Sequence, residues 1–423
     1  MSKLKHSYDH HRCVTHLYGI PLFIFNCATW ERRKITFYQI TMQYRKIKGN
    51  NIFDGYQFVG KEKVLVTQAD GTIEAIIDEK DAGDDVQIFD GIICPGFVNA
   101  HCHIELSHLK NNIPQHTGLV NFILDILKLR AADEETKQQA MRLAEEELYN
   151  SGTVAVGDIC NTADSIFLKK DSKLHWHNFI EVSGFNEDFA DKRFENGQNI
   201  HQQFSNITSN NSINPHAPYS VSSKLFQLIN ESSLGETLSI HNQETPAENE
   251  FLQNKTGDFL RLYENLGIDI SSFQPTNKSS LQSWLPQLHH GKKIISVHNS
   301  FTNEADLIFA KQFSSTQDMY FCLCPNANLY IENTLPPVEM LMKNNCNIVL
   351  GTDSYASNTQ LNIFEEIKTI QKNFPDIGLE KILQWATING ARALGLDDLC
   401  GSFEKGKKAG VVLINNEKSL SVL

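Results

Sequence analysis

Two histidines with a single residue between them are the first pattern in this sequence that indicates chemistry. His101 and His103 follow the apolar segment 96–100. Residues two apart on an extended strand face the same side, so both imidazoles would point to one place. Neutral imidazoles bind zinc well, and three or four nitrogen and oxygen donors complete a site. His241 and Asp353, each at the end of another apolar segment, can supply the remaining donors.

A catalytic metal site also needs a group that moves protons. Such a site keeps one position open for water and lowers the pKa of that water from 15.7 to about 7. A nearby carboxyl group can then protonate the leaving group. Glu244 follows His241 by three residues, which is a suitable position for this acid. The alternative at this point is an ordinary acidic residue at the start of a helix.

The apolar segments between residues 97 and 400 alternate with helical stretches such as 133–148 and 379–394. Eight strands that alternate with helices predict a (β/α)8 barrel, in which functional residues lie just beyond the C-terminal ends of strands. A single histidine at such an end is more simply a buried core residue, but polar residues recur at five of the eight ends. The expected strands are 96–100, 153–156, 178–182, 212–214, 238–240, 293–297, 320–323 and 347–350. The residues at their ends are His101 with His103, His216, His241, His298 and Asp353.

Both ends of the chain outside this region have β-strand character. Short alternating segments and the Asp70-Gly71 turn predict a small antiparallel unit within residues 42–97. Residues 400–423 contain a further apolar segment, so we expect one small β-sandwich built from both ranges and a catalytic barrel over 98–399. Residues 1–41 lack the pattern of a signal peptide and are interpreted as an extension outside the folded core.

Seven segments, in order, resemble the amidohydrolase superfamily. They are similar to its aminohydrolase and chlorohydrolase branch, which includes aminofutalosine, S-adenosylhomocysteine and guanine deaminases. The resemblance covers roughly residues 60–415, and a single His-x-His pattern would be far weaker than the ordered set. The segments are 94–103, 216–222, 241–244, 296–299, 324–328, 351–358 and 386–394.

The resemblance implies one divalent metal ion, zinc first and iron as the alternative. Its ligands would be His101, His103, His241 and Asp353. No lysine occupies the end of the fourth strand, where relatives with two metals carry a bridging lysine. One metal is therefore favoured over two.

The resemblance also implies roles around the metal. His298 would bind or orient the water, Asp353 would act as general base, and Glu244 would carry the proton to a ring nitrogen. Three residues are expected to contact substrate: His216 at the end of the fourth strand, Glu105 in the loop after the first strand, and Asn328 after the seventh strand.

The expected function is metal-dependent hydrolysis of carbon–nitrogen bonds other than peptide bonds. The expected reaction deaminates an amino-substituted heteroaromatic molecule, purine-like or adenosine-derived, with water and releases ammonia. The alternatives on the same site are hydrolysis of a cyclic amide and dechlorination of a ring, and a barrel that has lost catalysis is a third. A phosphoesterase barrel would need further ligands, for which Asp158 is the one candidate.

Composition and charge exclude two classes of binding partner. The net charge of −12 over 423 residues argues against a nucleic-acid binder, and no apolar run is long enough to span a membrane. The nine cysteines are odd in number and scattered, which favours reduced thiols in the cytoplasm over a disulfide framework. The family resemblance implies a small heterocyclic substrate and water as the partners, and a homodimer is a candidate assembly.

Overall fold

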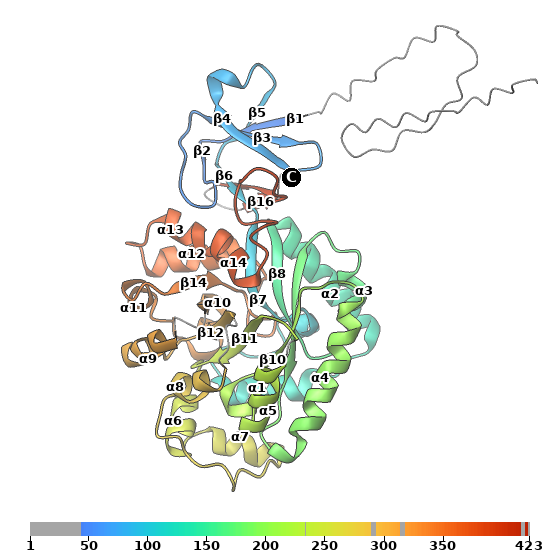
Figure 1. Cartoon of the computed structure of the whole chain (residues 1–423), viewed down its shortest axis with the longest axis vertical. Coiled ribbons are helices and arrows are strands. Elements are labelled where there is room, and N and C mark those ends of the chain that lie inside the picture. The colour runs from blue at the N-terminus through green and yellow to red at the C-terminus, as the bar shows by residue number, and fades with distance from the viewer. Residues whose placement is uncertain (1–43, 233, 289–292, 314–317, 416–418, 422–423) are drawn as a thin grey trace, which may run out of the picture. The chain divides into compact units, whose positions relative to one another are not determined.

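The fold is known from a computed structural model, which describes residues 44–232, 234–288, 293–313, 318–415 and 419–421. The expected N-terminal extension, 1–41, lies outside the described residues. The described chain has a mixed α/β fold with parallel sheets (Figure 1). None of the described helices is both long and apolar enough to cross a membrane.

Two parallel four-stranded sheets form the centre of the α/β region, in the orders β7-β8-β9-β10 and β11-β12-β13-β14. Every neighbouring pair is parallel and consecutive in the chain, as expected when a helical crossover follows each strand. All eight strands expected from the sequence are confirmed. They are β7 (Phe97–Cys102), β8 (Thr153–Cys160), β9 (His175–Val182), β10 (Asn211–Pro215), β11 (Thr237–Asn242), β12 (Lys293–His298), β13 (Met319–Leu323) and β14 (Asn347–Leu350).

Backbone hydrogen bonds also join the two parallel sheets at both of their edges. At one edge the His241 amide donates to the His216 carbonyl over 3.0 Å. At the other, the amides of Thr352 and Asp353 both donate to the His101 carbonyl over 3.1 Å, and Cys102 forms a parallel bridge with Asp353. The strand ends that carry the expected site residues therefore lie side by side.

Helices pack around the parallel strands, and nearly all residues of these strands are buried, which explains their nearly continuous apolar sequences. The expected helix over 379–394 is one helical stretch with a π-helical turn at Trp385–Asn389. Gly390 in it packs against the first strand, because a Cβ there would lie 2.8 Å from the Cβ of Val98. The helices are α1 (Leu119–Leu129), α2 (Glu134–Asn150), α3 (Ile166–Lys169), α4 (Ala190–Ser205), α5 (Ser223–Glu231), α6 (Pro246–Asn254), α7 (Phe259–Leu266), α8 (Ser280–Trp284), α9 (Glu304–Ala310), α10 (Pro325–Glu332), α11 (Val338–Lys343), α12 (Ile363–Asn373), α13 (Leu379–Gln384) and α14 (Gly390–Leu394).

Two further four-stranded sheets contain the remaining strands, in the orders β4-β3-β1-β5 and β16-β15-β6-β2. The C-terminal strand β15 pairs with β6 from the N-terminal part, so both ends of the chain contribute to one sheet (Figure 1). The expectation of a purely antiparallel unit is wrong, because β5 is parallel to β1 and β2 is parallel to β6. The β3–β4 hairpin intervenes between β1 and β5, so the chain re-enters the sheet in its original direction. The strands are β1 (Tyr44–Lys48), β2 (Asn51–Ile52), β3 (Lys63–Gln68), β4 (Ile73–Asp78), β5 (Val86–Ile88), β6 (Ile92–Pro95), β15 (Val411–Ile414) and β16 (Ser419–Ser421).

A buried ion pair lies at the C-terminal end of β8. The ammonium of Lys169 lies 2.5 Å from Asp158 Oδ2 and donates to Asn178 Oδ1 over 2.7 Å, and both members of the pair are at most 1% exposed. The other oxygen of Asp158 accepts the backbone amide of Ile104, 2.8 Å away. Asp158 thus holds the segment that follows His103, and it is not a further metal ligand.

We expect Lys169→Met to lower the free energy of unfolding by about 3–5 kcal/mol, because it leaves the Asp158 carboxylate buried without its cation. The measurement is equilibrium unfolding in urea. Lys137→Met is the matched control, since the Lys137–Asp164 pair is partly exposed and a change of less than about 1 kcal/mol is expected there. Equal small losses in both variants would contradict a structural role for the buried pair.

Candidate metal centre

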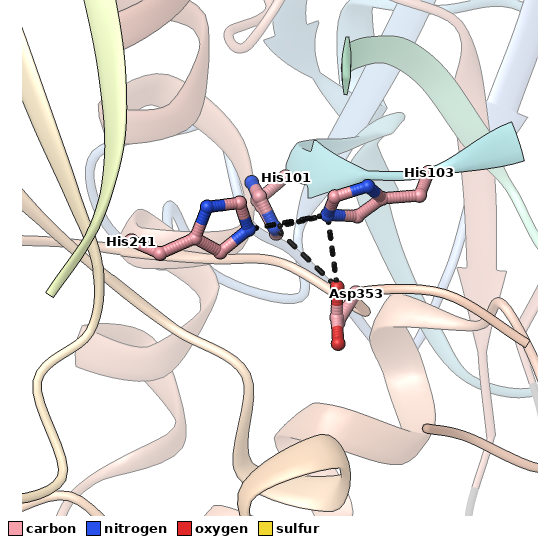
Figure 2. Close-up of side chains that lie close together, drawn as sticks. All are labelled: His101, His103, His241 and Asp353. Atoms are coloured by element: carbon pink, nitrogen blue, oxygen red, sulfur yellow. Dashed lines mark hydrogen bonds and ion pairs between the residues drawn. The ribbon is translucent and has the colours of Figure 1, made fainter. Parts of the chain in front are cut away.

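Four side chains from three strand ends converge on one point (Figure 2). The Nε2 atom of His103 lies 3.1 Å from that of His101 and 3.3 Å from that of His241. Asp353 Oδ1 lies 3.4 Å from His101 Nε2 and 3.2 Å from His103 Nε2. All four side chains are nearly or wholly buried. The structure thus brings together all four residues that the sequence singled out as metal ligands.

The backbone turns sharply at two of the strand ends that surround the cluster. His298, at the end of β12, has φ 72°, and Asp353, just beyond β14, has φ 57°. Left-handed conformations are costly for residues with a side chain and concentrate at functional sites. For Asp353 the turn is fixed by its amide, which donates to the His101 carbonyl. The same strand end that carries one expected ligand thus orients another.

The donor set fits a divalent cation. His241 Nδ1 donates to the His216 carbonyl over 2.8 Å, which leaves Nε2 of His241 as an unprotonated ligand atom. Burial lowers the pKa of both His101 and His241 to about 3, so their rings are neutral. Facing lone pairs and a buried carboxylate repel one another unless a positive charge lies among them. Three imidazole nitrogens and one carboxylate oxygen are also a typical ligand set for zinc.

Asp353 and His103 shift the pKa of one another in opposite directions. Burial disfavours the charged form of His103, but the hydrogen bond and charge of Asp353 outweigh it and raise the His103 pKa. For Asp353 burial likewise opposes ionisation, and the hydrogen bonds from His101 and His103 still hold its pKa well below the usual range. The carboxylate is therefore ionised, and Ser357 donates to its second oxygen over 2.5 Å.

Glu244 and His298 form a second pair beside the four converging residues. Glu244 Oε1 lies 3.5 Å from His298 Nε2, and both side chains are buried. Burial, with the charges of Asp353 and Glu248, raises the pKa of Glu244 well above its ordinary value, so this carboxyl group retains its proton. Burial lowers the His298 pKa to about 3, so the ring is neutral. A protonated carboxyl beside a neutral imidazole can deliver a proton at the site.

The three expected substrate contacts have different surroundings. His216 lines the cavity at the site. Asn328 instead donates its amide to His298 Nδ1 over 3.1 Å, so it orients that ring. Glu105 accepts the backbone amides of Asn161 and Thr162 and does not line the cavity. Direct substrate contact thus has geometric support for His216, and the structure gives Asn328 and Glu105 other partners.

Sequence reasoning missed Glu181, at the end of β9. Its carboxylate faces the cavity, 3.6 Å from His241 Nδ1, and is 7% exposed. Asn161, in the loop held by Glu105, donates to Glu181 Oε1 over 2.8 Å. No motif marks this residue, but its position at the end of an expected strand, next to the strand that ends at His216, was a signal that could have found it.

A cavity of about 210 Å³ opens onto three of the four converging residues, His103, His241 and Asp353. Apolar side chains of α1, among them Phe122 and Ile126, form one wall, and the polar groups of the strand ends form the other. A second cavity of about 480 Å³ adjoins it and shares His216 and Tyr219 as lining residues. The combined space suits a flat, partly apolar ligand that presents one end to the polar groups.

Comparison with known proteins agrees with this fold and site. The profile of the amidohydrolase family matches residues 92–422. The chain is 26% identical over 355 residues to a 5′-deoxyadenosine deaminase of Methanococcus vannielii. The alignment covers 79% of this chain and 78% of the relative. It is also 26% identical to a 5-methylthioadenosine/S-adenosylhomocysteine deaminase of Thermoanaerobacter pseudethanolicus, over 78% of this chain and 76% of the relative.

A solved structure with the same fold is the aminofutalosine deaminase of Helicobacter pylori. Its TM-score is 0.74 at 23% identity, and the match covers 88% of this chain and 93% of that one. Fold and site together define an α/β protein with three histidines and an aspartate clustered at the ends of its parallel strands. The chain belongs to the amidohydrolase family and is a hydrolase that acts on carbon–nitrogen bonds other than peptide bonds.

Proposed function

We propose that this enzyme deaminates an adenosine-derived nucleoside with water and releases ammonia. The observation that carries the proposal is the pair of Glu244 and His298 beside the cluster of His101, His103, His241 and Asp353, at the wall of one cavity. Replacement of an aromatic amino group needs an activated water and an acid for the ring nitrogen. The relatives named as adenosine-type deaminases point to the same reaction.

One divalent metal ion, zinc by the chemistry of its donors, would be held by His101, His103, His241 and Asp353. When bound, such an ion lowers the pKa of water to about 7 and supplies a nucleophile at neutral pH. Asp353 has a second oxygen outside the cluster, held by Ser357, and is the proposed general base.

Glu244 and His298 have separate tasks in the proposal. Glu244 holds a proton and would deliver it to the ring nitrogen next to the reacting carbon. The Asn328 amide donates to His298 Nδ1, so the ring proton is on Nε2, which faces Glu244 and the site. His298 would therefore orient water by donating from that atom.

We further propose that the two parallel sheets close into the expected (β/α)8 barrel over 98–399. The backbone contacts between β10 and β11, and between β7 and the segment after β14, support closure. A shared apolar cluster, with Ile47, Leu65, Ile93 and Val411 among its members, supports a sandwich from 42–97 and 400–423. The seven cysteines of the described residues are free, which supports a cytoplasmic location. The homodimer stays a prediction.

The test measures ammonia release from 5′-deoxyadenosine, methylthioadenosine, S-adenosylhomocysteine, adenosine and guanine. Hydrolysis of a cyclic amide releases no ammonia, so a cyclic amide is tested in parallel by its ring opening. We expect at least one adenosine derivative to exceed guanine and the cyclic amide by about 100-fold or more in kcat/KM, because binding groups beyond the base add transition-state contacts. Preference for the cyclic amide, or no ammonia from any nucleoside, would contradict the proposal.

A further inference from the structure

We propose that Glu181 and His216 together bind the vicinal hydroxyl groups of the substrate's ribose, which makes this enzyme selective for ribonucleosides. The inference rests on the proposed function and names the substrate class more narrowly. The two residues come from the neighbouring strand ends of β9 and β10, and both line the cavity at the candidate metal centre.

Glu181 is a buried carboxylate with one oxygen left to bind a ligand. Asn161 donates to Oε1 over 2.8 Å and so fixes the carboxylate plane. Among the described residues no hydrogen bond reaches Oε2, and His241 Nδ1, which lies 3.6 Å from it, already donates to the His216 carbonyl. A carboxylate that is 7% exposed is costly without hydrogen-bond donors. A ligand in the cavity is therefore the expected source of those donors.

His216 presents a second acceptor next to Glu181. Its Nδ1 lies 2.6 Å from the Ser220 hydroxyl, which donates to the Ala217 carbonyl and so accepts from the histidine. This arrangement leaves His216 Nε2 unprotonated. A ring nitrogen of His216 lies within 4.8 Å of a carboxylate oxygen of Glu181, so the two side chains are neighbours at the cavity.

A carboxylate oxygen and an imidazole nitrogen that both accept hydrogen bonds select a ligand with two adjacent donors. The 2′- and 3′-hydroxyls of a ribose are such a pair, whereas a phosphate or carboxylate would be repelled. The position also suits a nucleoside, because the reacting base would face His298 and Glu244 while the ribose lies farther along the same cavity. The adjoining apolar cavity, which shares His216 and Tyr219, remains for a 5′ substituent.

The experiment compares kcat/KM for 5′-deoxyadenosine, 2′,5′-dideoxyadenosine and 3′,5′-dideoxyadenosine. We expect the wild-type enzyme to prefer the ribonucleoside by about 10- to 100-fold over at least one deoxy analogue, as for a lost hydrogen bond to a charged group. In Glu181→Ala that preference disappears because the rate on the ribonucleoside falls while the rate on the analogue stays the same. Glu181→Gln keeps an acceptor without the charge and is expected to fall between the two.

The matched control is Glu187→Gln, an exposed acidic residue six positions along the chain, which should keep the wild-type preference. If Glu181 had only a structural role, Glu181→Ala would lose kcat/KM equally on all three substrates. That result would overturn the proposal. Wild-type enzyme that deaminates all three equally would also overturn it and leave the proposed function intact. If the enzyme deaminated no nucleoside, both the diol-binding proposal and the proposed function would be contradicted.

A second cation is the competing explanation, since Glu181, His216 and His241 also form a group of close donors. Metal analysis of the same preparations distinguishes the two. Diol binding predicts one equivalent of metal per chain in the wild type and in Glu181→Ala. Two equivalents that fall to one in the variant would overturn the proposal and assign Glu181 to a metal site.

Discussion

Glu244→Gln is expected to retain the metal and lose about 100- to 10,000-fold in kcat, the range typical of general acid–base catalysis. Glutamine has the same shape, so the surrounding contacts persist, including the hydrogen bond from the residue-244 amide to Glu248. It cannot deliver a carboxylic proton to the substrate. The measurements are ammonia release for turnover and elemental analysis for metal content.

Glu264→Gln is a suitable control for the Glu244 prediction, because this glutamate is exposed on α7 and does not line the cavity. It should turn over at the wild-type rate. A Glu244→Gln variant with wild-type kcat would show that the proton comes from elsewhere. Loss of metal together with turnover would instead assign Glu244 to the metal site and contradict its separate role.

His241→Ala is expected to lose metal and activity together. His241 supplies one of three converging nitrogens, and its Nδ1 hydrogen bond to the His216 carbonyl aims that nitrogen at the centre. Changes to residues that merely orient a ligand already weaken metal affinity by about 10- to 100-fold, so loss of the ligand itself should exceed that. Metal titration of the chelated protein measures the affinity, and ammonia release measures the activity.

A histidine away from the site provides the control for this loss. His201, half-buried on α4, makes a local contact to Ser205, and His201→Ala should keep metal and activity. Thermal unfolding of both variants checks that each is folded. A folded His241→Ala protein that binds metal with unchanged affinity and is active would refute the ligand assignment.

The sequence predicted those parts of the fold and site that follow from local pattern. Alternating apolar and helical segments predicted all eight parallel strands, because each buried strand is a short apolar run bounded by helical stretches. The spacing of His101 and His103 predicted convergence, since strand geometry places both on one side. The β character of both chain ends predicted that the two ends share one β unit, and β6 and β15 do pair with each other.

Contacts between side chains of separate loops could not be predicted in this way. Glu105 was expected at the substrate, but its carboxylate accepts two backbone amides of the loop after β8. One of these amides belongs to Asn161, whose side chain donates to Glu181 at the cavity. Asn328 was also expected at the substrate, yet its amide holds His298. Such contacts depend on the direction of each loop after its strand, which no spacing in the sequence encodes.

The most direct test of the central claim measures metal content and deaminase activity on the same preparation. A chelator should remove one equivalent of metal per chain and abolish ammonia release from the best adenosine derivative. Return of zinc should restore both in proportion. Full deaminase activity in protein that contains no metal would contradict the account.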